Sequence, residues 1–376
     1  MMTIALSLAV ACGIGNAAVD KPQSAAANTP TVLEGAAPAG LNELHQRFVE
    51  ALDDDKRRAT LDHISRTMPQ SIPDVQWLYD LFIRFPQDSV RQAVLASLRR
   101  LDESNANLEP AFIQYLKLPE NEAKVFGIAG ATRLRSARAL PLITEIARQR
   151  FKVKSPGETP ILSDRNAWWA QYEALSSLAQ LQGAATLPLL KRKSEESPAV
   201  ARILGLHLWK ESLPQIAKWA AGKKFSEQAH EALTSDVPLA DLRATRPEMM
   251  RLVRDPKSDR ELRHLLALKI GFCSTAEEID GLLAEEAATK DPETKLMLSA
   301  AIFASRSPRT IPWLKALAAG SNDPRKRMGA LTQLGLLLPL AEQRELWTSA
   351  ATHEADPDNR QRAADMLRAA SQPTAP

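Results

Sequence analysis

The stretch DPRKRMGALTQLGLLLP, residues 323–339, decides the fold. It opens on Asp323-Pro324 and closes on Leu338-Pro339. Proline suits the first turn of a helix, where its missing N–H would be unpaired, and an aspartate before it accepts hydrogen bonds from the free N–H groups. In between, apolar residues recur at helical spacing, at Met328, Leu331, Leu334 and Leu338. The stretch predicts an amphipathic helix with one apolar stripe, followed by a second helix.

An apolar residue followed by proline and a further apolar helix recurs along the chain. Successive prolines are 26 to 37 residues apart, except for gaps of 47 and 65, and each is expected to start the second helix of a pair. The instances are Ile72-Pro73, Glu109-Pro110, Leu140-Pro141, Leu187-Pro188, Leu213-Pro214, Arg246-Pro247, Ile311-Pro312 and Leu338-Pro339.

The first helix of each pair has a different mark, an Asp-Pro cap or an equivalent. A second apolar stripe, formed by Val90, Val94, Leu98 and Leu101, follows one of these caps. A pair with one stripe per helix cannot bury its core alone, so we expect neighbouring pairs to stack. The marks are Asp255-Pro256, Asp291-Pro292, Asp323-Pro324 and Asp356-Pro357, with Ser197-Pro198 and Gln87-Asp88 in equivalent places.

These residues resemble the HEAT-repeat family, in particular its short bacterial type, in which Asp-Pro-x-x-x-Arg opens the first helix. Arg327 and Arg360, each four residues after the aspartate, and Lys295 match that pattern. The resemblance covers residues 41–371 and implies an all-α fold, a right-handed α-solenoid of about nine HEAT-like helix pairs. It implies little about function, because HEAT-like folds serve scaffolds, transport receptors, lyase subunits and DNA-repair proteins.

Composition agrees with a helical array. The chain has 376 residues, 44% of them hydrophobic but only 5% aromatic, and 15 glycines. Its 48 basic and 45 acidic residues leave a formal net charge of +3, which does not indicate nucleic acid as a partner.

The N-terminus is expected to be an export signal over residues 1–15. A short apolar run, residues 4–10, leads into Leu8-Ala9-Val10-Ala11-Cys12, which resembles the lipobox of bacterial lipoproteins and implies lipidation of Cys12. Residues 16–40 are rich in Ala and Pro and are expected to be a flexible tether, and residues 372–376 a disordered tail. This predicts a periplasmic protein held at the outer membrane only by a lipid anchor. The alternatives are cleavage near Gly15, giving a soluble periplasmic or secreted protein, and a ragged cytosolic N-terminus.

The long gap of 47 residues is explained by an insertion at 150–165, between two helix signals. The preceding segment, residues 131–154, carries seven basic residues against the single acidic residue Glu145. Arginine forks suit carboxylates and phosphates, so this segment and the tryptophans beyond the insertion are candidate partner-binding residues. The candidates are Arg133, Arg135, Arg138, Lys152, Lys154, Trp168 and Trp169. The alternative interpretation is a solvated face with helix-dipole contacts and one core tryptophan.

No catalytic or metal-binding constellation is evident. The six histidines are scattered, and no nucleophile elbow, phosphate loop or dinucleotide fingerprint occurs. We therefore expect no enzyme, no metal and no cofactor. Cys273 is expected to be a buried small hydrophobe, and Lys191-Arg192-Lys193 to meet the negative end of a helix dipole.

The sequence thus predicts a cell-envelope scaffold or adaptor that binds a protein partner on the concave surface of the solenoid. A second hypothesis is recognition of an anionic glycan or lipid headgroup by the segment 131–154. A third is a catalytic accessory similar to the lyase subunits.

Overall fold

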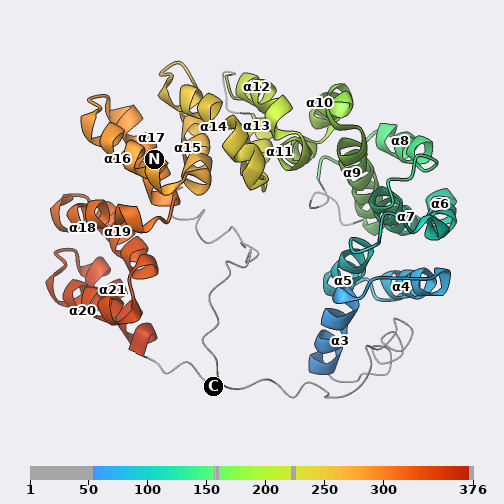
Figure 1. Cartoon of the computed structure of the whole chain (residues 1–376), viewed down its shortest axis with the longest axis horizontal. Helices are drawn as coiled ribbons and strands as arrows, with labels where there is room; N and C mark the ends of the chain where they lie inside the picture. Colours follow the sequence, from blue (N-terminus) through green and yellow to red (C-terminus); the bar gives the residue numbers. More distant parts are fainter. Residues whose placement is uncertain (1–53, 156, 158–160, 222–225, 372–376) are drawn as a thin grey trace. The chain divides into compact units, whose positions relative to one another are not determined.

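The computed structural model describes residues 54–155, 157, 161–221 and 226–371. The predicted signal peptide, Cys12, the tether and the tail lie outside the described residues. Within them the chain is all-α and contains no strand, as predicted. Nine helix pairs and one further helix follow one another (Figure 1). No described helix is both long and apolar enough to cross a membrane.

Each pair has a first and a second helix. The first helices are α3 (Asp54–Arg66), α5 (Asp88–Leu98), α7 (Asn121–Arg133), α9 (Leu162–Gln182), α11 (Ala201–His207), α13 (Glu227–Thr234), α15 (Arg260–Cys273), α17 (Pro292–Ala304) and α19 (Pro324–Leu337). The second helices are α4 (Ile72–Arg84), α6 (Glu109–Lys117), α8 (Leu140–Arg148), α10 (Leu187–Glu196), α12 (Trp209–Ala220), α14 (Leu239–Arg254), α16 (Ala276–Ala288), α18 (Ile311–Gly320) and α20 (Leu340–His353). Helix α21 (Pro357–Ser371) closes the array, and short 3₁₀ turns at 106–108, 183–186, 198–200 and 308–310 precede α6, α10, α11 and α18.

The predicted stripes form the core. All eight stripe residues named above, including Val94 and Leu334, are buried. They contribute to hydrophobic clusters that follow one another along the chain, and Trp219 packs against both of the two largest. Trp313 packs against both the second cluster and a small C-terminal one, and its ring lies edge-on to Phe303. Each pair therefore buries its stripes against its neighbours, as expected for a solenoid.

Two of the prolines expected to start helices lie inside them instead. Pro214 is the sixth residue of α12, and Pro247 is the ninth of α14. Residues 209–213 of α12 precede Pro214, and residues 239–246 of α14 precede Pro247; Trp209 and Thr245 are buried among them, and the Trp209 indole N–H donates to Thr245 Oγ1 at 2.8 Å. This burial outweighs the backbone hydrogen bond that an internal proline removes.

One expected first-helix cap is also wrong. Asp255 ends α14, and its side chain accepts from the Lys257 N–H within a turn. Helix α15 is capped by Asp259, which accepts from the N–H groups of Glu261 and Leu262. Asp291, Asp323 and Asp356 do cap the following helix, as predicted.

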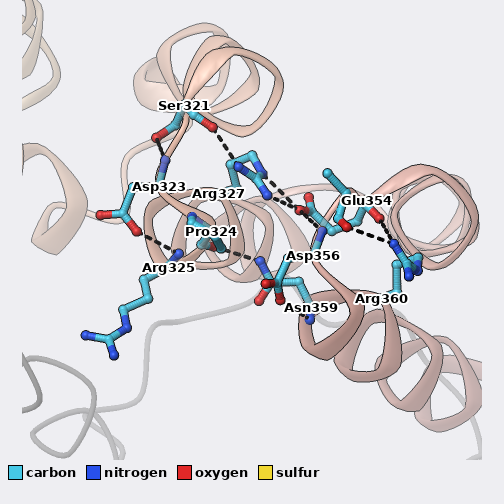
Figure 2. Close-up of polar contacts among 10 residues, drawn as sticks. Ser321, Asp323, Pro324, Arg325, Arg327, Glu354, Asp356, Asn359 and Arg360 are labelled. Atoms are coloured by element: carbon cyan, nitrogen blue, oxygen red, sulfur yellow. Dashed lines mark hydrogen bonds and ion pairs between the residues drawn. The ribbon is translucent and has the colours of Figure 1, made fainter.

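The basic residue four positions after the cap reaches backwards to the end of the preceding helix. Figure 2 shows Arg327 donating to the Ser321 carbonyl, at 2.8 Å, and to the carboxylate of Glu354, the residue that follows α20 of its own pair, 2.9 Å from Nε. Arg360 likewise donates to the carbonyls of Glu354 and Ala355. Arg263 donates to the Val253 carbonyl and Lys124 to the Pro119 carbonyl. Because carbonyls at a helix end lack intrahelical partners, these basic side chains bind the end of the preceding helix, or the loop directly after it, at four junctions of the described chain.

From α3 to α17 the first helices of successive pairs pack directly on one another, and glycine permits the closest approach. A Cβ on Gly271 of α15 would lie 2.2 Å from the Ala301 carbonyl oxygen of α17. Gly205 of α11 meets the Ala232 carbonyl of α13 in the same way, at 2.7 Å. Gly205 and Gly271 are two repeat lengths apart in the sequence, so the same close contact occurs at equivalent positions of two repeats.

Replacing Gly271 by alanine should lower the free energy of unfolding by about 1–3 kcal/mol, because α15 and α17 must move apart. The matched control is Gly281→Ala in α16, where nothing lies within 4 Å of the added methyl group. That change should leave stability unchanged or raise it by up to about 1 kcal/mol, because alanine favours a helix. Urea denaturation of both variants tests this, and equal effects would contradict the close-contact explanation.

The contact between Arg327 and Glu354 should make stability depend on pH. Hydrogen bonds from Arg327 lower the pKa of Glu354, more than burial raises it. A carboxylate with a lowered pKa stabilises the fold above its unfolded pKa of about 4.3 and loses that contribution as the pH falls. Arg327→Gln should therefore lower Tm at pH 7, and the difference from the wild type should shrink near pH 3. The control is Arg325→Gln, since Figure 2 shows this side chain pointing away from the cluster. An equal Tm loss at both pH values would assign the effect to the Ser321 carbonyl instead.

Candidate functional site

The three candidate arginines of segment 131–154 are held by carboxylates of the preceding pair. Arg133, the last residue of α7, donates from Nε to the Leu101 carbonyl at 2.9 Å, and its Nη1 lies 2.9 Å from Glu103 Oε1. Arg135 has a positive φ of 49° in the turn after α7, and its Nε lies 3.2 Å from Glu103 Oε2. Glu103 therefore accepts a hydrogen bond from Arg133 and forms an ion pair with Arg135.

Arg138 and Ser136 meet a second carboxylate, that of Glu109 at the start of α6. Arg138 Nη1 lies 3.3 Å from Glu109 Oε2, and Ser136 Oγ donates to Oε1 at 2.5 Å. The side chains of Arg135 and Arg138 are still 75% and 71% exposed. These ion pairs join two helix pairs, and exposed pairs of this kind add little stability. Much of the positive charge that the sequence places here is thus matched by carboxylates about 30 residues earlier.

The two adjacent tryptophans of α9 have different surroundings. Trp168 stacks on Tyr172, with ring centroids 5.0 Å apart, and its indole N–H donates to Ser197 Oγ at 3.1 Å. The Ser197 hydroxyl in turn donates to the Lys154 carbonyl. Trp168 therefore helps to hold the insertion against the start of α11.

Trp169 belongs to a cluster with α4 and α5. Its ring lies 5.8 Å from that of Phe82, and the Arg91 guanidinium lies 5.4 Å from its centroid. Its indole N–H donates to Glu173 at 3.2 Å. Burial raises the pKa of Glu173, against the hydrogen bond from Trp169 and the charge of Arg99. Both tryptophans are partly buried, so neither projects freely from the surface.

The insertion is clamped by a buried lysine that sequence reasoning assigned to a helix dipole. Lys193, only 2% exposed near the end of α10, donates to the Gln149 carbonyl at 2.5 Å and to Glu196 Oε2 at 2.9 Å. Glu196 also accepts from the Phe151 N–H at 3.1 Å, and the ammonium lies 5.6 Å from the Phe151 ring. Burial favours the neutral acid, but the contacts with Lys193 and Phe151 outweigh it and lower the pKa of Glu196. The only sequence signal for this clamp is the i, i+3 spacing of the two charges.

Six of the seven candidate residues therefore form two groups with different partners, and Trp169 packs apart from both, against Phe82 and Arg91. Arg133, Arg135 and Arg138 face the preceding pair. Lys154 and Trp168 share Ser197, while Lys152 Nζ lies 3.5 Å from Asp164 at the start of α9. The second group positions the insertion on the first-helix side of the array.

Two hollows lie near these groups. The larger, of about 480 Å³, lies along α8 and is lined by Ala137, Leu140, Pro141, Thr144, Glu145, Arg148 and Gln182. The other, of about 410 Å³, is lined by Lys154, Ser155, Pro198, Ala199, Ser226, Glu227, His230, Glu231 and Glu261. It adjoins a ladder of polar contacts between successive first helices. Arg202 forms an ion pair with Glu231 at 3.6 Å and Arg260 with Glu293 at 3.2 Å, and His230 Nδ1 lies 3.4 Å from Glu261 Oε1.

The described part of the chain contains no group of three His, Cys, Asp or Glu residues that could hold a metal ion. Cys273 is buried, as predicted, and burial raises the pKa of its thiol. Burial lowers the pKa of His207, whose Nε2 lies 2.9 Å from Ser176 Oγ. These groups are part of the packing between helices.

Comparison with known proteins assigns no family. No family model and no curated protein matches the chain. A chain of a solved Kap95:Nup1 complex is 14% identical with a TM-score of 0.35, and the match covers 88% of this chain and 51% of that one. This chain thus spans about half the length of that protein. A crystal structure of an engineered protein matches at 13% identity and a TM-score of 0.23, covering 88% and 89% of the two chains.

Lys193→Met should release the insertion, because the Gln149 carbonyl and Glu196 lose their buried donor. We expect the free energy of unfolding to fall by about 1–3 kcal/mol and hydrogen exchange to quicken at residues 151–155. Arg192→Met, at an exposed position on the same helix, is the control. Unchanged exchange at 151–155 would show that Trp168 and Ser197 suffice to hold the insertion.

Proposed function

We propose that this chain is a scaffold or adaptor of the HEAT-repeat type, which holds a protein partner on its helical surface. The observation that carries the proposal is the continuity of that surface. The close glycine contacts and the ladder of polar contacts join successive first helices, and the basic side chains that donate to carbonyls join a first helix to the end of the preceding second helix. An ordered array of this kind offers many modest contacts along an extended partner.

The position of the basic residues supports the HEAT-like assignment. Arg263, Arg327 and Arg360 each stand four residues after a capping aspartate and donate to the end of the preceding helix. The motif therefore has a structural role in the repeat, which is the reason a sequence built from such repeats would retain it.

The kinds of partner that the Arg-rich segment, residues 131–154, could bind are fewer than the sequence alone suggests. Arg133, Arg135 and Arg138 are matched by Glu103 and Glu109, so an anionic glycan or lipid headgroup would have to compete with these carboxylates. This favours a protein partner over recognition of a free anion. A catalytic accessory role of the lyase type remains the third hypothesis, without a residue that favours it.

We further propose that the scaffold works in the bacterial cell envelope, anchored through Cys12 to the outer membrane. The support is the lipobox-like segment 8–12 and the Ala- and Pro-rich residues after it. A soluble periplasmic or secreted form is the alternative.

The first test is isolation of the full chain from its own cells, with mass spectrometry of its N-terminus and of the proteins cross-linked to it. We expect a diacylglyceryl group on Cys12, loss of membrane association in Cys12→Ser, and one reproducible protein partner. An unmodified terminus would contradict the anchor, and the absence of a protein partner would contradict the scaffold.

The triple variant Arg133→Gln, Arg135→Gln, Arg138→Gln separates the protein and anion hypotheses. Protein docking should weaken only slightly and should change little with ionic strength, because many contacts share the binding energy. Binding of an anion by these arginines should instead be abolished, and in the wild type it should fall steeply with salt.

A further inference from the structure

The turn between α17 and α18, residues 305–310, divides the packing of the array. Before it, each first helix from α3 to α17 packs on the next one, and α14 and α16 also pack on α17. After it, α18 packs on α19, α19 on α20 and α20 on α21. Within the described residues, no helix before the turn packs closely on any of these last four. Helices α18–α21, the terminal helices, therefore pack mainly among themselves.

The hydrophobic core divides at the same turn. The second cluster ends before it, and the two C-terminal clusters consist of buried residues from 314–363. Among the described residues only Trp313 packs against both the second cluster and a C-terminal one, and its ring centroid lies 5.0 Å from that of Phe303 of α17. The turn adds a contact with α16, where Arg309 Nη1 lies 3.9 Å from Asp280 Oδ2. Both of these side chains are more than half exposed, and such ion pairs add little stability, so the main link is the apolar contact of Trp313 with Phe303.

The backbone of the turn contains a conformation that residues other than glycine seldom adopt. Arg306 has a φ of 48°, in the left-handed region, and the only other described non-glycine residue with a positive φ is Arg135, at the corresponding place after α7. Arg135 lies 3.2 Å from Glu103, which ties its turn to the preceding pair. Arg306 is exposed, and the ion pair of its turn is made by Arg309 instead. In the described chain, the strained residue of turn 305–310 therefore lacks the carboxylate partner that Arg135 has.

We propose that the terminal helices rotate as one body relative to the rest of the array, about a joint at turn 305–310, and that the contact of Trp313 with Phe303 limits the motion. A hinge consists of a few loop residues that absorb the change in φ and ψ, while the packed group on each side keeps its own contacts. The terminal helices meet both conditions, because they have two hydrophobic clusters of their own and follow a short turn. Such a joint lets one array present its last helices to a partner at different angles. The joint is a property of the array itself, so a chain without a protein partner would keep it.

The test is double electron–electron resonance on the full chain, with spin labels on exposed residues of second helices. One label pair, Ala284→Cys in α16 and Glu345→Cys in α20, spans the joint. The control pair, Arg192→Cys in α10 and Ala244→Cys in α14, spans α11–α13. Cys12→Ser removes one native thiol, and the other, that of Cys273, is buried. Because α11 and α13 pack directly, we expect the α16–α20 distance distribution to be about twice as wide as the α10–α14 distribution.

Trp313→Ala should widen the α16–α20 distribution further, because it removes the apolar link. Its matched control is Trp219→Ala, whose tryptophan also packs against two clusters, but beside first helices that are in contact, so the α10–α14 distribution should stay the same. Arg306→Gly should widen the α16–α20 distribution without touching the core, because glycine adopts both signs of φ. This variant keeps the test valid even where Trp313→Ala disturbs the fold.

Three outcomes would overturn the proposal. The first is equal widths for the two label pairs in the wild type. The second is an α16–α20 distribution that neither Trp313→Ala nor Arg306→Gly widens. The third is an equal widening of the α10–α14 distribution by Trp219→Ala, which would show that loss of any such tryptophan loosens the array and that turn 305–310 is not a joint.

Discussion

The structure depends on a hydrogen bond from a basic side chain of one helix pair to backbone carbonyls of the preceding pair. A basic side chain one turn into a first helix donates to carbonyls that end the preceding second helix, as Arg263 does to Val253 and Arg360 does to Glu354 and Ala355. The contact satisfies acceptors that the helix leaves unpaired, and it also sets how the chain turns from one pair to the next. Since each pair can bury its stripes only against its neighbours, a contact that fixes adjacent pairs stabilises the whole array.

First helices and second helices pack on their neighbours in different ways. First helices approach one another closely, with Gly271 against the Ala301 carbonyl as the clearest case, and ion pairs such as that of Arg260 with Glu293 run between them. Second helices pack mainly on the first helices beside them, as α8 does on α9. The row of direct contacts between first helices ends at α17, so helices α18–α21 join the array mainly through Trp313 and Phe303.

The insertion after α8 shows how a solenoid adds a local feature without losing its repeat. Lys193 and Ser197 both come from the pair that follows the insertion; Lys193 bonds to the Gln149 carbonyl directly before the insertion, and Ser197 bonds to the Lys154 carbonyl within it. The cost of burying the Lys193 ammonium is offset by Glu196 and by carbonyl acceptors, which is the condition for a stable buried charge. These contacts hold residues 150–155 of the insertion, and Lys154 and Ser155 line the hollow that Glu227 and Glu261 also border.

The sequence by itself determined the repeat, since caps, stripes and period are local properties. The stripe from Met328 to Leu338 and the caps at Asp291, Asp323 and Asp356 follow from helix geometry within one or two turns. Its errors were also local. Pro214 and Pro247 lie inside helices because each helix begins earlier and includes a buried residue ahead of the proline, Trp209 or Thr245, and that burial depends on contacts beyond the segment.

The tertiary structure decided how the charges are used. The sequence marks Arg133, Arg135 and Arg138 as a basic cluster, but their partners Glu103 and Glu109 stand about 30 residues earlier, at a distance that only the stacking of pairs closes. It likewise decided that Lys193 is buried and that Trp313 joins two hydrophobic clusters. A helix pattern gives the direction of each side chain relative to its own axis, whereas the group it meets depends on which neighbouring pair lies against it and at what distance.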